Sequence, residues 1–498
     1  MGIIQKQAIQ NTIITYTGTL IAFANIIFIQ PFFLTPEELG LTRILFSFAS
    51  LVSTFIPLGI TSITTRYFPV FRNPEKGHHG FFGFMILYAL AGYLLIAVLL
   101  WFGRDFFIGQ YVEKSGLFAE FFDYVFPLSL FLGLFTILQT YAFALFRPGV
   151  PALLNDVVSR IAVIAVTGIY FMRWITLDQY ILIFTLVYGL QTLLLLLFIF
   201  RIDKLKLSLD RDFFSRQQPK KIFTFGLLMT FASLSSLGLK FLDTIMLGRE
   251  VKLDKVGIYA IAAFIPTIIE IPLGALEKIT NPRIAHAMVH DDKTHIRELY
   301  YRSTKYMLLL GGLLFLLVNL NAFDLLSIVP RKDYIEGINV VWIISIGTLF
   351  NMATGTNNTL IFNSDRYYVY GIGLLVGLFI LAFISNLIFI PLYGMEGAAA
   401  ATVLSAFLYN LAKYLFIWKK YNLQPFDKET FLMVLVILVT GTLAFFIPMP
   451  GNLYLSVAIR SVIIIVLYAA LVHILRLSPE TKGIIVNFVK NLTGKKKK

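Results

Sequence analysis

Long, uninterrupted runs of apolar residues recur along this chain, and they limit the possible folds more strongly than any other feature. Fourteen such runs occur, and a helix that crosses a bilayer needs about 20 residues. Because the backbone in lipid must satisfy its hydrogen bonds internally, continuous apolar runs predict helices rather than barrel strands. The runs lie near residues 11–34, 41–65, 81–102, 121–146, 152–173, 179–200, 222–247, 256–280, 305–320, 340–362, 369–390, 397–418, 431–447 and 453–475. We expect interruptions near residue 57 and at 266–272, where prolines occur.

The composition agrees with a chain that lies almost entirely in the bilayer. Of 498 residues, 58% are hydrophobic and 14% are charged, whereas soluble domains are about 45–50% apolar and about 25% charged. The absence of cysteine excludes disulfides and thiolate ligands, and no P-loop motif for nucleotides occurs. We therefore expect an all-α integral membrane protein with about 14 transmembrane helices, without a cofactor or a metal site.

Basic residues are distributed unequally between the loops. With the N-terminus inside, 28 of the 42 Lys and Arg residues fall in cytoplasmic segments, 8 in the opposite loops and six within the runs. This excess predicts a multi-pass protein of the bacterial inner membrane with both termini in the cytoplasm. It also accounts for the net charge of +14, so we expect contact with anionic membrane lipid and not with nucleic acid.

The second half of the chain repeats features of the first half. The sequence EELGLTR at 37–43 corresponds to DKVGIYA at 254–260, and Pro-Leu-Gly occurs at 57–59 and again at 272–274. Six helices per copy predict two pseudo-symmetric lobes of parallel topology around a central cavity. We expect an N-terminal lobe at 1–200, a cytoplasmic basic linker at 201–221, a C-terminal lobe at 222–420, two additional helices at 421–475 and a basic cytoplasmic tail at 476–498.

Polar residues form stripes along one face of four predicted helices. They are Asn11, Thr15, Gly18 and Asn25 in the first helix, Thr136, Gln139 and Thr140 in the fourth, Ser233, Ser236, Lys240 and Asp243 in the seventh, and Asn351, Thr354 and Asn358 in the tenth. Such stripes indicate either close helix packing or a cavity lined by amides and hydroxyls, which suits sugar hydroxyls. Their recurrence in repeat-related helices favours the cavity.

Charged residues within the apolar runs are candidates for function, because a charge in the hydrocarbon costs several kcal/mol. Glu270 lies near the middle of its helix between Pro266 and Pro272, and we predict that it takes part in ion coupling. The alternative is a protonated carboxyl group that is bonded to a neighbour. Lys240 is predicted to be a cavity cation, with two alternatives: its side chain extends to the interface, or it pairs with Asp243.

Four further cations lie in or beside the runs. Arg43 and Arg160 are candidates for the cavity, although Asp156 precedes Arg160 by four residues, a spacing that favours an internal ion pair. Lys413 and Arg460 are within reach of an interface, where we expect their charged ends to lie.

Four stretches of the chain carry a resemblance to a known family. They are LGLTRILFSFASLVSTFIPLGITSITTRYFPVF at 39–71, LDTIMLG at 242–248 with VGIYAIA at 256–262, NPRIAHAMVHDDKTHIRELYYRSTKYML at 281–308, and IPLYGMEGAAAATVLS at 390–405. Together they resemble the polysaccharide and lipid-linked oligosaccharide flippases of the MATE/MOP superfamily.

This resemblance implies alternating access and an undecaprenyl-diphosphate oligosaccharide as the cargo, with cavity cations that meet the diphosphate. Asp243 falls on the family's acidic residue of helix 7, but Thr244 follows it where many members have Arg. Lys240, one turn earlier, is the candidate replacement. The two additional helices are similar to those of lipid II flippases, where such helices border a groove for the lipid tail.

We therefore expect a flippase for a surface polysaccharide, O-antigen or capsule precursor, and not an enzyme. One alternative is a drug/cation antiporter of the same superfamily, which would favour an acidic cavity. Another is a membrane glycosyltransferase or polymerase, which would need a longer outward loop than the about 18 residues that occur here. The expected partners are the polyprenyl-diphosphate-linked sugar, membrane lipid, and the glycosyltransferases and polymerase of the same pathway. The candidate substrate-binding residues are Lys240, Asp243, Asn25, Arg43, Arg160, Ser233, Ser236, Gln139, Asn351 and Asn358, with Glu270 for ion coupling.

Overall fold

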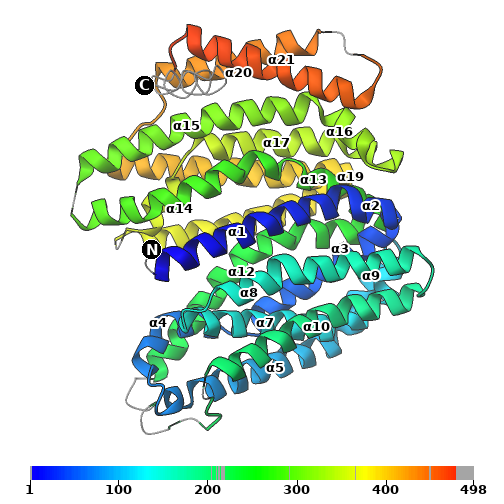
Figure 1. Ribbon diagram of the computed structural model, residues 1–498, viewed down its shortest axis with the longest axis vertical. Coiled ribbons are helices and arrows are strands. Elements are labelled where there is room, and N and C mark those ends of the chain that lie inside the picture. The colour runs from blue at the N-terminus through cyan, green and yellow to red at the C-terminus, as the bar shows by residue number, and fades with distance from the viewer. Residues whose placement is uncertain are drawn as a thin grey trace, which may run out of the picture. The chain divides into compact units, whose positions relative to one another are not determined.

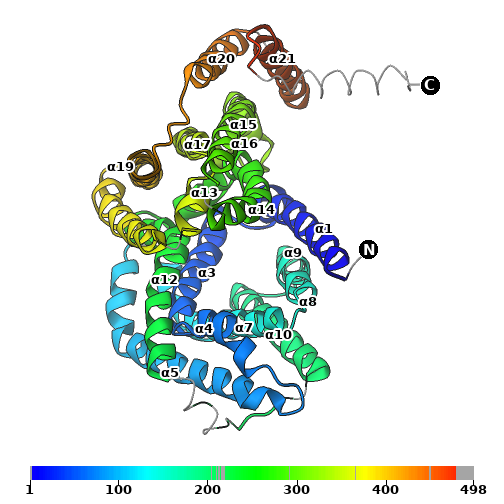
Figure 2. The same ribbon diagram turned by 90° about the vertical axis from the view of Figure 1, so that its left-hand side faces the viewer.

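The structure is a computed structural model that describes residues 3–203, 205–208, 210, 214, 219–290, 292–364, 366–447 and 450–477, without the side chains of 3–12, 232 and 236. In these ranges the regular structure consists of helices only (Figures 1 and 2), which confirms the predicted all-α membrane fold class. The chain divides into two compact units. The first unit comprises Met1–Ile261, Val329–Asp333 and Leu375–Ala398, and the second comprises Ala262–Ile328, Tyr334–Leu374 and Ala399–Lys498. The predicted lobes at 1–200 and 222–420 have different boundaries and stay a prediction.

The first unit is built around α7 (Val125–Ala144), which packs against α3 (Pro36–Phe55), α4 (Ile60–Phe71), α5 (Phe81–Tyr111) and α10 (Leu177–Ile202). Its other helices are α1 (Ile3–Ala24), η1 (Asn25–Ile29), α2 (Gln30–Phe33), η2 (Gly77–Gly80), α6 (Gly116–Glu120), η3 (Phe122–Tyr124), α8 (Gly149–Leu153), η4 (Leu154–Val158), α9 (Ser159–Phe171), α12 (Pro219–Glu250) and most of α13 (Leu253–Phe264). Helix α12 lies along α3.

The second unit is built around α15 (Lys293–Leu320), which packs against α14 (Thr267–Val289), α17 (Ile338–Ala353), α20 (Lys428–Phe445) and α21 (Leu453–Ile474). Its shorter helices are α16 (Ala322–Ile328), most of η5 (Lys332–Gly337) and α18 (Asn357–Phe362). Helix α19 (Tyr368–Tyr421) contributes residues to both units.

Eleven helices of the described residues are long and apolar enough to cross a membrane, or up to thirteen if each of two bent pairs forms one span. These numbers count α19 once, although its 54 residues include a non-helical Gly394 (φ 58°, ψ −126°). A helix of that length rises about 80 Å at 1.5 Å per residue, far more than a hydrocarbon core of about 30 Å. The predicted number of fourteen helices among all residues stays a prediction.

The second predicted helix begins earlier than the sequence suggested, at Pro36 instead of residue 41. Thr35 and Glu38 form a capping box, in which the Glu38 N–H donates to Thr35 Oγ1 (3.2 Å) and the Thr35 N–H donates to Glu38 Oε2 (2.8 Å). These two bonds satisfy backbone donors of the first turn, so the helix starts before its apolar run does. The predicted interruption near residue 57 is confirmed, because α3 ends at Phe55 and α4 begins at Ile60.

The predicted interruption at 266–272 is confirmed at one proline only. Helix α13 ends at Phe264 and α14 begins at Thr267, directly after Pro266. Pro272 lies inside α14 and does not end it, because one lost backbone hydrogen bond is tolerated where a helix packs along a neighbour. Other irregularities were not predicted. They include the π-helical turns η1 and η4 within the first and fifth predicted helices and the break between α17 and α18 within the tenth.

The two copies of the internal repeat meet within the first unit, at the start of α3 and the start of α13. A Cβ atom at Gly40 would overlap the carbonyl oxygen of Leu253, and a Cβ atom at Gly257 would overlap the carbonyl oxygen of Pro36. The contact is reciprocal, as at a local two-fold axis. Glycine therefore occurs in both copies because the two backbones touch there.

We expect Gly40→Ala and Gly257→Ala each to lower the free energy of unfolding by about 2 kcal/mol, because the added methyl group meets backbone atoms that cannot rotate away. Thermal unfolding of the purified protein in detergent measures the loss. The control is Gly109→Ala, since a Cβ atom there meets nothing within 4 Å. Equal midpoints of thermal unfolding for all three variants would contradict the backbone contact between α3 and α13.

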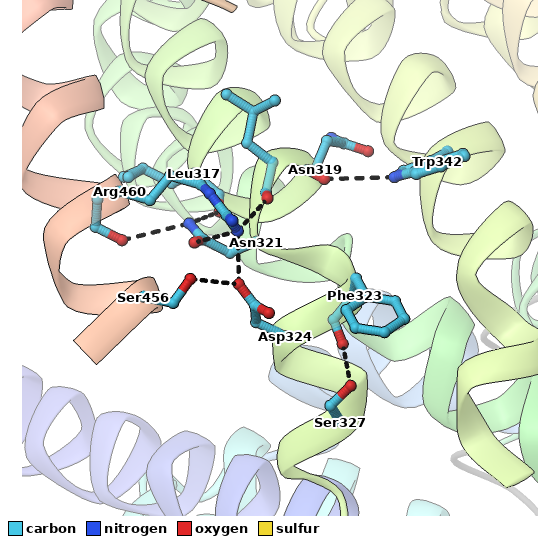
Figure 3. Close-up of polar contacts among 11 residues, drawn as sticks. Leu317, Asn319, Asn321, Phe323, Asp324, Ser327, Trp342, Ser456 and Arg460 are labelled. Carbon is cyan, nitrogen blue, oxygen red and sulfur yellow. Dashed lines mark hydrogen bonds and ion pairs between the residues drawn. The ribbon is translucent and has the colours of Figure 1, made fainter. Parts of the chain in front are cut away.

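The last helix of the described residues, α21, is held on α15 and α16 by charged contacts. Arg460 of α21 donates to Asp324 Oδ2 (2.6 Å) and to the Leu320 carbonyl oxygen (2.8 Å), and Ser456 also donates to Asp324 (Figure 3). The side chains of Arg460 and Asp324 are only 18% and 12% exposed. Arg460 is thus neutralised by a carboxylate within the unit, a partner that the sequence did not indicate.

A second charged contact joins α15 to the start of α20. Lys305 Nζ lies 2.7 Å from Asp427 and 2.6 Å from Glu429. Burial raises the pKa of Asp427, but hydrogen bonds from Lys305 and Thr430 outweigh it, so the pKa lies below the usual value. The stabilisation that follows from this lowered pKa is present near neutral pH and is lost as the pH falls through it.

Candidate functional site

Lys240 lies in the second part of α12, which is bent by 48° between Pro219–Ser235 and Leu237–Glu250. Its side chain is exposed, and Nζ lies 5.5 Å from the ring centre of Phe241. The charge of Lys240 is close enough to that of Arg160 for the two to repel each other. Ser233 on the same helix is half-buried, whereas the Ser236 side chain lies outside the described residues.

Arg160 connects α9 to α1. Its guanidinium donates to the carbonyl oxygen of Gly18 and lies 3.8 Å from Asp156, four residues earlier. The predicted i, i+4 ion pair is therefore confirmed, but it uses only part of the guanidinium. Gly18 packs directly on the π-helical turn η4, where a Cβ atom would overlap the backbone of Asp156. Such turns are frequent at functional sites.

Three further predicted cavity residues of the first unit lie on α3, η1 and α7. Arg43 of α3 donates to Gln30 Oε1 (2.6 Å). Asn25 begins the π-helical turn η1, is buried, and its Oδ1 atom has no hydrogen-bond donor among the described residues. Gln139 is half-buried on α7, and no hydrogen bond joins it to Arg43 or Asn25 in the described part of the chain.

Asp243 has partners that differ from the predicted one. Its carboxylate accepts hydrogen bonds from Tyr259 Oη (2.9 Å) and from Asn386 Nδ2 (2.8 Å). Neither residue was predicted from the sequence, because Asn386 belongs to a helix with no polar stripe. The alternative in which Asp243 neutralises Lys240 is therefore not what the structure shows, and Lys240 stays an exposed cation.

In the second unit, Glu270 lies in the first turn of α14 and is exposed. It accepts a hydrogen bond from Asn351 Nδ2 of α17 (3.0 Å). The sequence predicted each residue separately, so the structure joins two of its candidates.

Lys413 is the most deeply buried lysine in the described part of the chain, with 2% of its surface exposed. Its Nζ donates to Asn358 Oδ1 (2.8 Å) and lies 4.2 Å from the ring centre of Tyr409. The charge of Glu277, on α14, acts on that of Lys413. The expectation that Lys413 extends to the interface is therefore wrong, because its counter-charge lies inside the unit.

Glu277 was not predicted, although the sequence contains a signal for it. It follows Glu270 by seven residues, which places both carboxylates on one face of α14. The two carboxylates are close enough to repel each other. Each unit thus holds its own set of charged residues within the spans, and each set contains both cations and carboxylates. Within the described residues, no group of three or more His, Cys, Asp or Glu could hold a metal ion.

Comparisons with known proteins agree with this architecture. The lipid II flippase MurJ, in an inward closed conformation, is similar over 94% of this chain and 98% of its own, with 16% identity and a TM-score of 0.72. An inward-facing multidrug resistance MATE family transporter of the MOP superfamily is similar over 83% of this chain and 98% of its own, with 15% identity and a TM-score of 0.64. For the MATE multidrug transporter DinF-BH the corresponding shares are 84% and 95%, with 16% identity and a TM-score of 0.53.

The fold is thus that of the MOP-superfamily transporters. A family model described as polysaccharide biosynthesis protein matches residues 4–278, which is more than half of the chain. The chain belongs to the polysaccharide biosynthesis protein family. No curated protein sequence matches it significantly.

We expect Glu277→Gln to lower the free energy of unfolding by about 2 kcal/mol or more, because it leaves the buried Lys413 charge without its counter-charge. Adding Lys413→Gln should recover most of this loss, since an amide can still bond to Asn358. Thermal unfolding in detergent measures both variants. Glu298→Gln is the control, because Glu298 pairs with Arg302 on an exposed surface, where such pairs contribute about 0–1 kcal/mol. Purely additive losses in the double variant would contradict the pairing.

Proposed function

We propose that this protein flips an undecaprenyl-diphosphate-linked oligosaccharide across the bacterial cytoplasmic membrane by alternating access. The observation that carries the proposal is the pair of cations in the first unit, the exposed Lys240 and the nearby Arg160. Family membership and the fold shared with a lipid II flippase support the same cargo class.

The electrostatics of this pair favour an anionic ligand. Lys240 and Arg160 repel each other, and Asp156 neutralises only one of the two charges. A diphosphate carries about two negative charges at neutral pH, and burying an isolated charge in hydrocarbon costs tens of kcal/mol. An anion between the two cations removes the repulsion, and the cations remove most of the transfer cost, while the polyprenyl tail stays in lipid.

The amides and hydroxyls that are predicted to line the cavity suit the sugar part of the same cargo. Asn25 has a buried oxygen that can accept a hydrogen bond from a hydroxyl group, and Ser233 and Gln139 are partly exposed.

We also propose that both the N-terminus and the C-terminus lie in the cytoplasm, and that the protein acts beside the glycosyltransferases and polymerase of the same pathway. A drug/cation antiporter is the second candidate function, and the structural similarity to a MATE family transporter supports it. However, the two cations Lys240 and Arg160 would repel a cationic drug in the first unit.

We expect Lys240→Gln to weaken binding of a diphosphate-linked oligosaccharide to the purified protein about tenfold to a hundredfold. The reason is the loss of a charge-assisted hydrogen bond worth about 1.5–3 kcal/mol. Flipping in proteoliposomes should fall in parallel. The control is Lys420→Gln, at the exposed end of α19, which should bind and flip like the parent. Undiminished binding in Lys240→Gln would refute the assigned role, since a lysine that reaches the interface would lose little.

Ion coupling is the second part of the proposal, and it concerns Glu270. The Asn351 amide holds the carboxylate in place, and its exposure admits a cation or a proton from water. Glu270→Gln should leave abundance and unfolding temperature near those of the parent, but flipping should no longer respond to an imposed H⁺ or Na⁺ gradient. Measurement of flipping with and without each gradient tests this. A Gln variant that still responds to the same gradient would exclude Glu270 from coupling.

A further inference from the structure

A pocket of about 700 Å³ lies in the first unit, away from Lys240, where the ends of α4 and α7 meet the start of α12. Ligand pockets typically measure about 300–1,000 Å³, so this one can hold a small polar group. Its lining includes the hydroxyl residues Thr61, Ser62, Thr65 and Thr140 and the two cations Arg66 and Arg72. The distribution of basic residues places this end of the helices at the cytoplasmic surface.

The two arginines make the pocket strongly cationic. No carboxylate lines it, and neither arginine forms an ion pair with a carboxylate of the described residues. Both side chains are exposed. Two guanidinium groups beside one pocket provide a charge of about +2, which matches the charge of a diphosphate.

Aromatic rings hold both guanidinium groups in place. Cζ of Arg66 lies 4.6 Å from the ring centre of Phe225, and Cζ of Arg72 lies 4.3 Å from that of Phe146. Both rings line the same pocket. A guanidinium group that stacks on a ring keeps the N–H donors along its edges for an anion, and their planar geometry suits phosphate oxygens.

The threonine hydroxyls add a complementary set of acceptors. Thr65 Oγ1 donates to the carbonyl oxygen of Thr61 (3.0 Å), and Thr140 Oγ1 donates to that of Thr136 (2.9 Å). Because their protons are used within the helices, these oxygen atoms are available as acceptors. They suit the hydroxyl donors of a sugar better than the oxygens of a phosphate.

We propose that this pocket binds the diphosphate, together with the sugar attached to it, of a lipid-linked cargo at the cytoplasmic surface before the cargo enters the transport pathway. This inference rests on the proposed function for the identity of the cargo, but the binding site itself does not depend on transport. The headgroup of an anionic phospholipid offers similar chemistry, with one phosphate instead of two and no sugar ring in most cases. Two charges against two cations favour the diphosphate.

The absence of cysteine from the chain allows a direct test with a single introduced thiol. Thr65→Cys places a thiol at the pocket, and Lys206→Cys places one at the same end of the unit, outside the lining residues. An impermeant maleimide labels each variant in inverted membrane vesicles and, separately, in phosphatidylcholine nanodiscs. Geranyl diphosphate is the added probe, with geraniol as the uncharged control.

We expect geranyl diphosphate to slow the labelling of Thr65→Cys but not of Lys206→Cys, and geraniol to protect neither. Adding Arg66→Gln or Arg72→Gln to Thr65→Cys should each raise the concentration of geranyl diphosphate that is needed for protection about tenfold, because each change removes a charge-assisted contact. Arg201 is an exposed arginine at the end of α10. The matched control Arg201→Gln should leave the protecting concentration of geranyl diphosphate unchanged. Unfolding temperatures near that of the parent show that the variants are folded.

Three results would overturn the proposal. They are protection that is unaffected by both pocket substitutions, labelling of Thr65→Cys in intact spheroplasts, and equal protection by phosphatidylglycerol in the nanodisc without geranyl diphosphate. The last result would identify an ordinary membrane lipid as the occupant. Flipping assays separate this inference from the proposed function. Undiminished flipping in Lys240→Gln with intact protection of Thr65→Cys would count against the proposed function and leave the pocket standing. Loss of flipping in Lys240→Gln without any protection of Thr65→Cys would overturn the pocket and leave the function standing.

Discussion

A charge inside a membrane span must be neutralised, hydrogen-bonded or kept in contact with water, and this requirement organises both units of the protein. Lys413 meets it through Asn358 and the charge of Glu277, and Arg460 meets it through Asp324. These residues are neutralised within the second unit, so their main contribution is to the stability and arrangement of its helices. Breaking such a buried pair exposes one uncompensated charge to a medium of low polarity.

Lys240 and Glu270 differ from these residues, because their side chains are exposed on the surface of their unit and no carboxylate or cation of the described residues forms an ion pair with them. A charge that contacts water can exchange its partner for a ligand at low cost, whereas a charge with a buried partner must first lose that partner. The distinction separates residues that hold the fold together from residues that can bind cargo or an ion. Arg160 lies between these cases, since one side of its guanidinium is bonded to Gly18 and Asp156 and its charge still acts on Lys240.

Close backbone contacts provide the precision that this arrangement needs. Gly40 and Gly257 allow α3 and α13 to touch, and Gly18 allows α1 to touch the π-helical turn η4. In a membrane, helices associate through such close packing because burial of apolar surface gives little advantage over lipid. The contact at η4 also brings the Gly18 carbonyl oxygen within reach of Arg160. A small residue in a polar stripe can therefore serve packing and the candidate site together.

The sequence by itself determined the class of fold, since apolar runs of about 20 residues predict membrane helices. It also identified Glu270 as a charge within a span and Asn351 and Asn358 as members of a polar stripe. It did not determine which polar residues meet. Lys413 and Arg460 look like residues that reach the interface, because a sequence shows their distance from the helix end and not the carboxylate on another helix. Asn386, the partner of Asp243, lies far along the chain from it and carries no local signal. Only the tertiary structure decided these pairings, because they depend on how helices rotate and pack, and that depends on contacts between residues far apart in the chain.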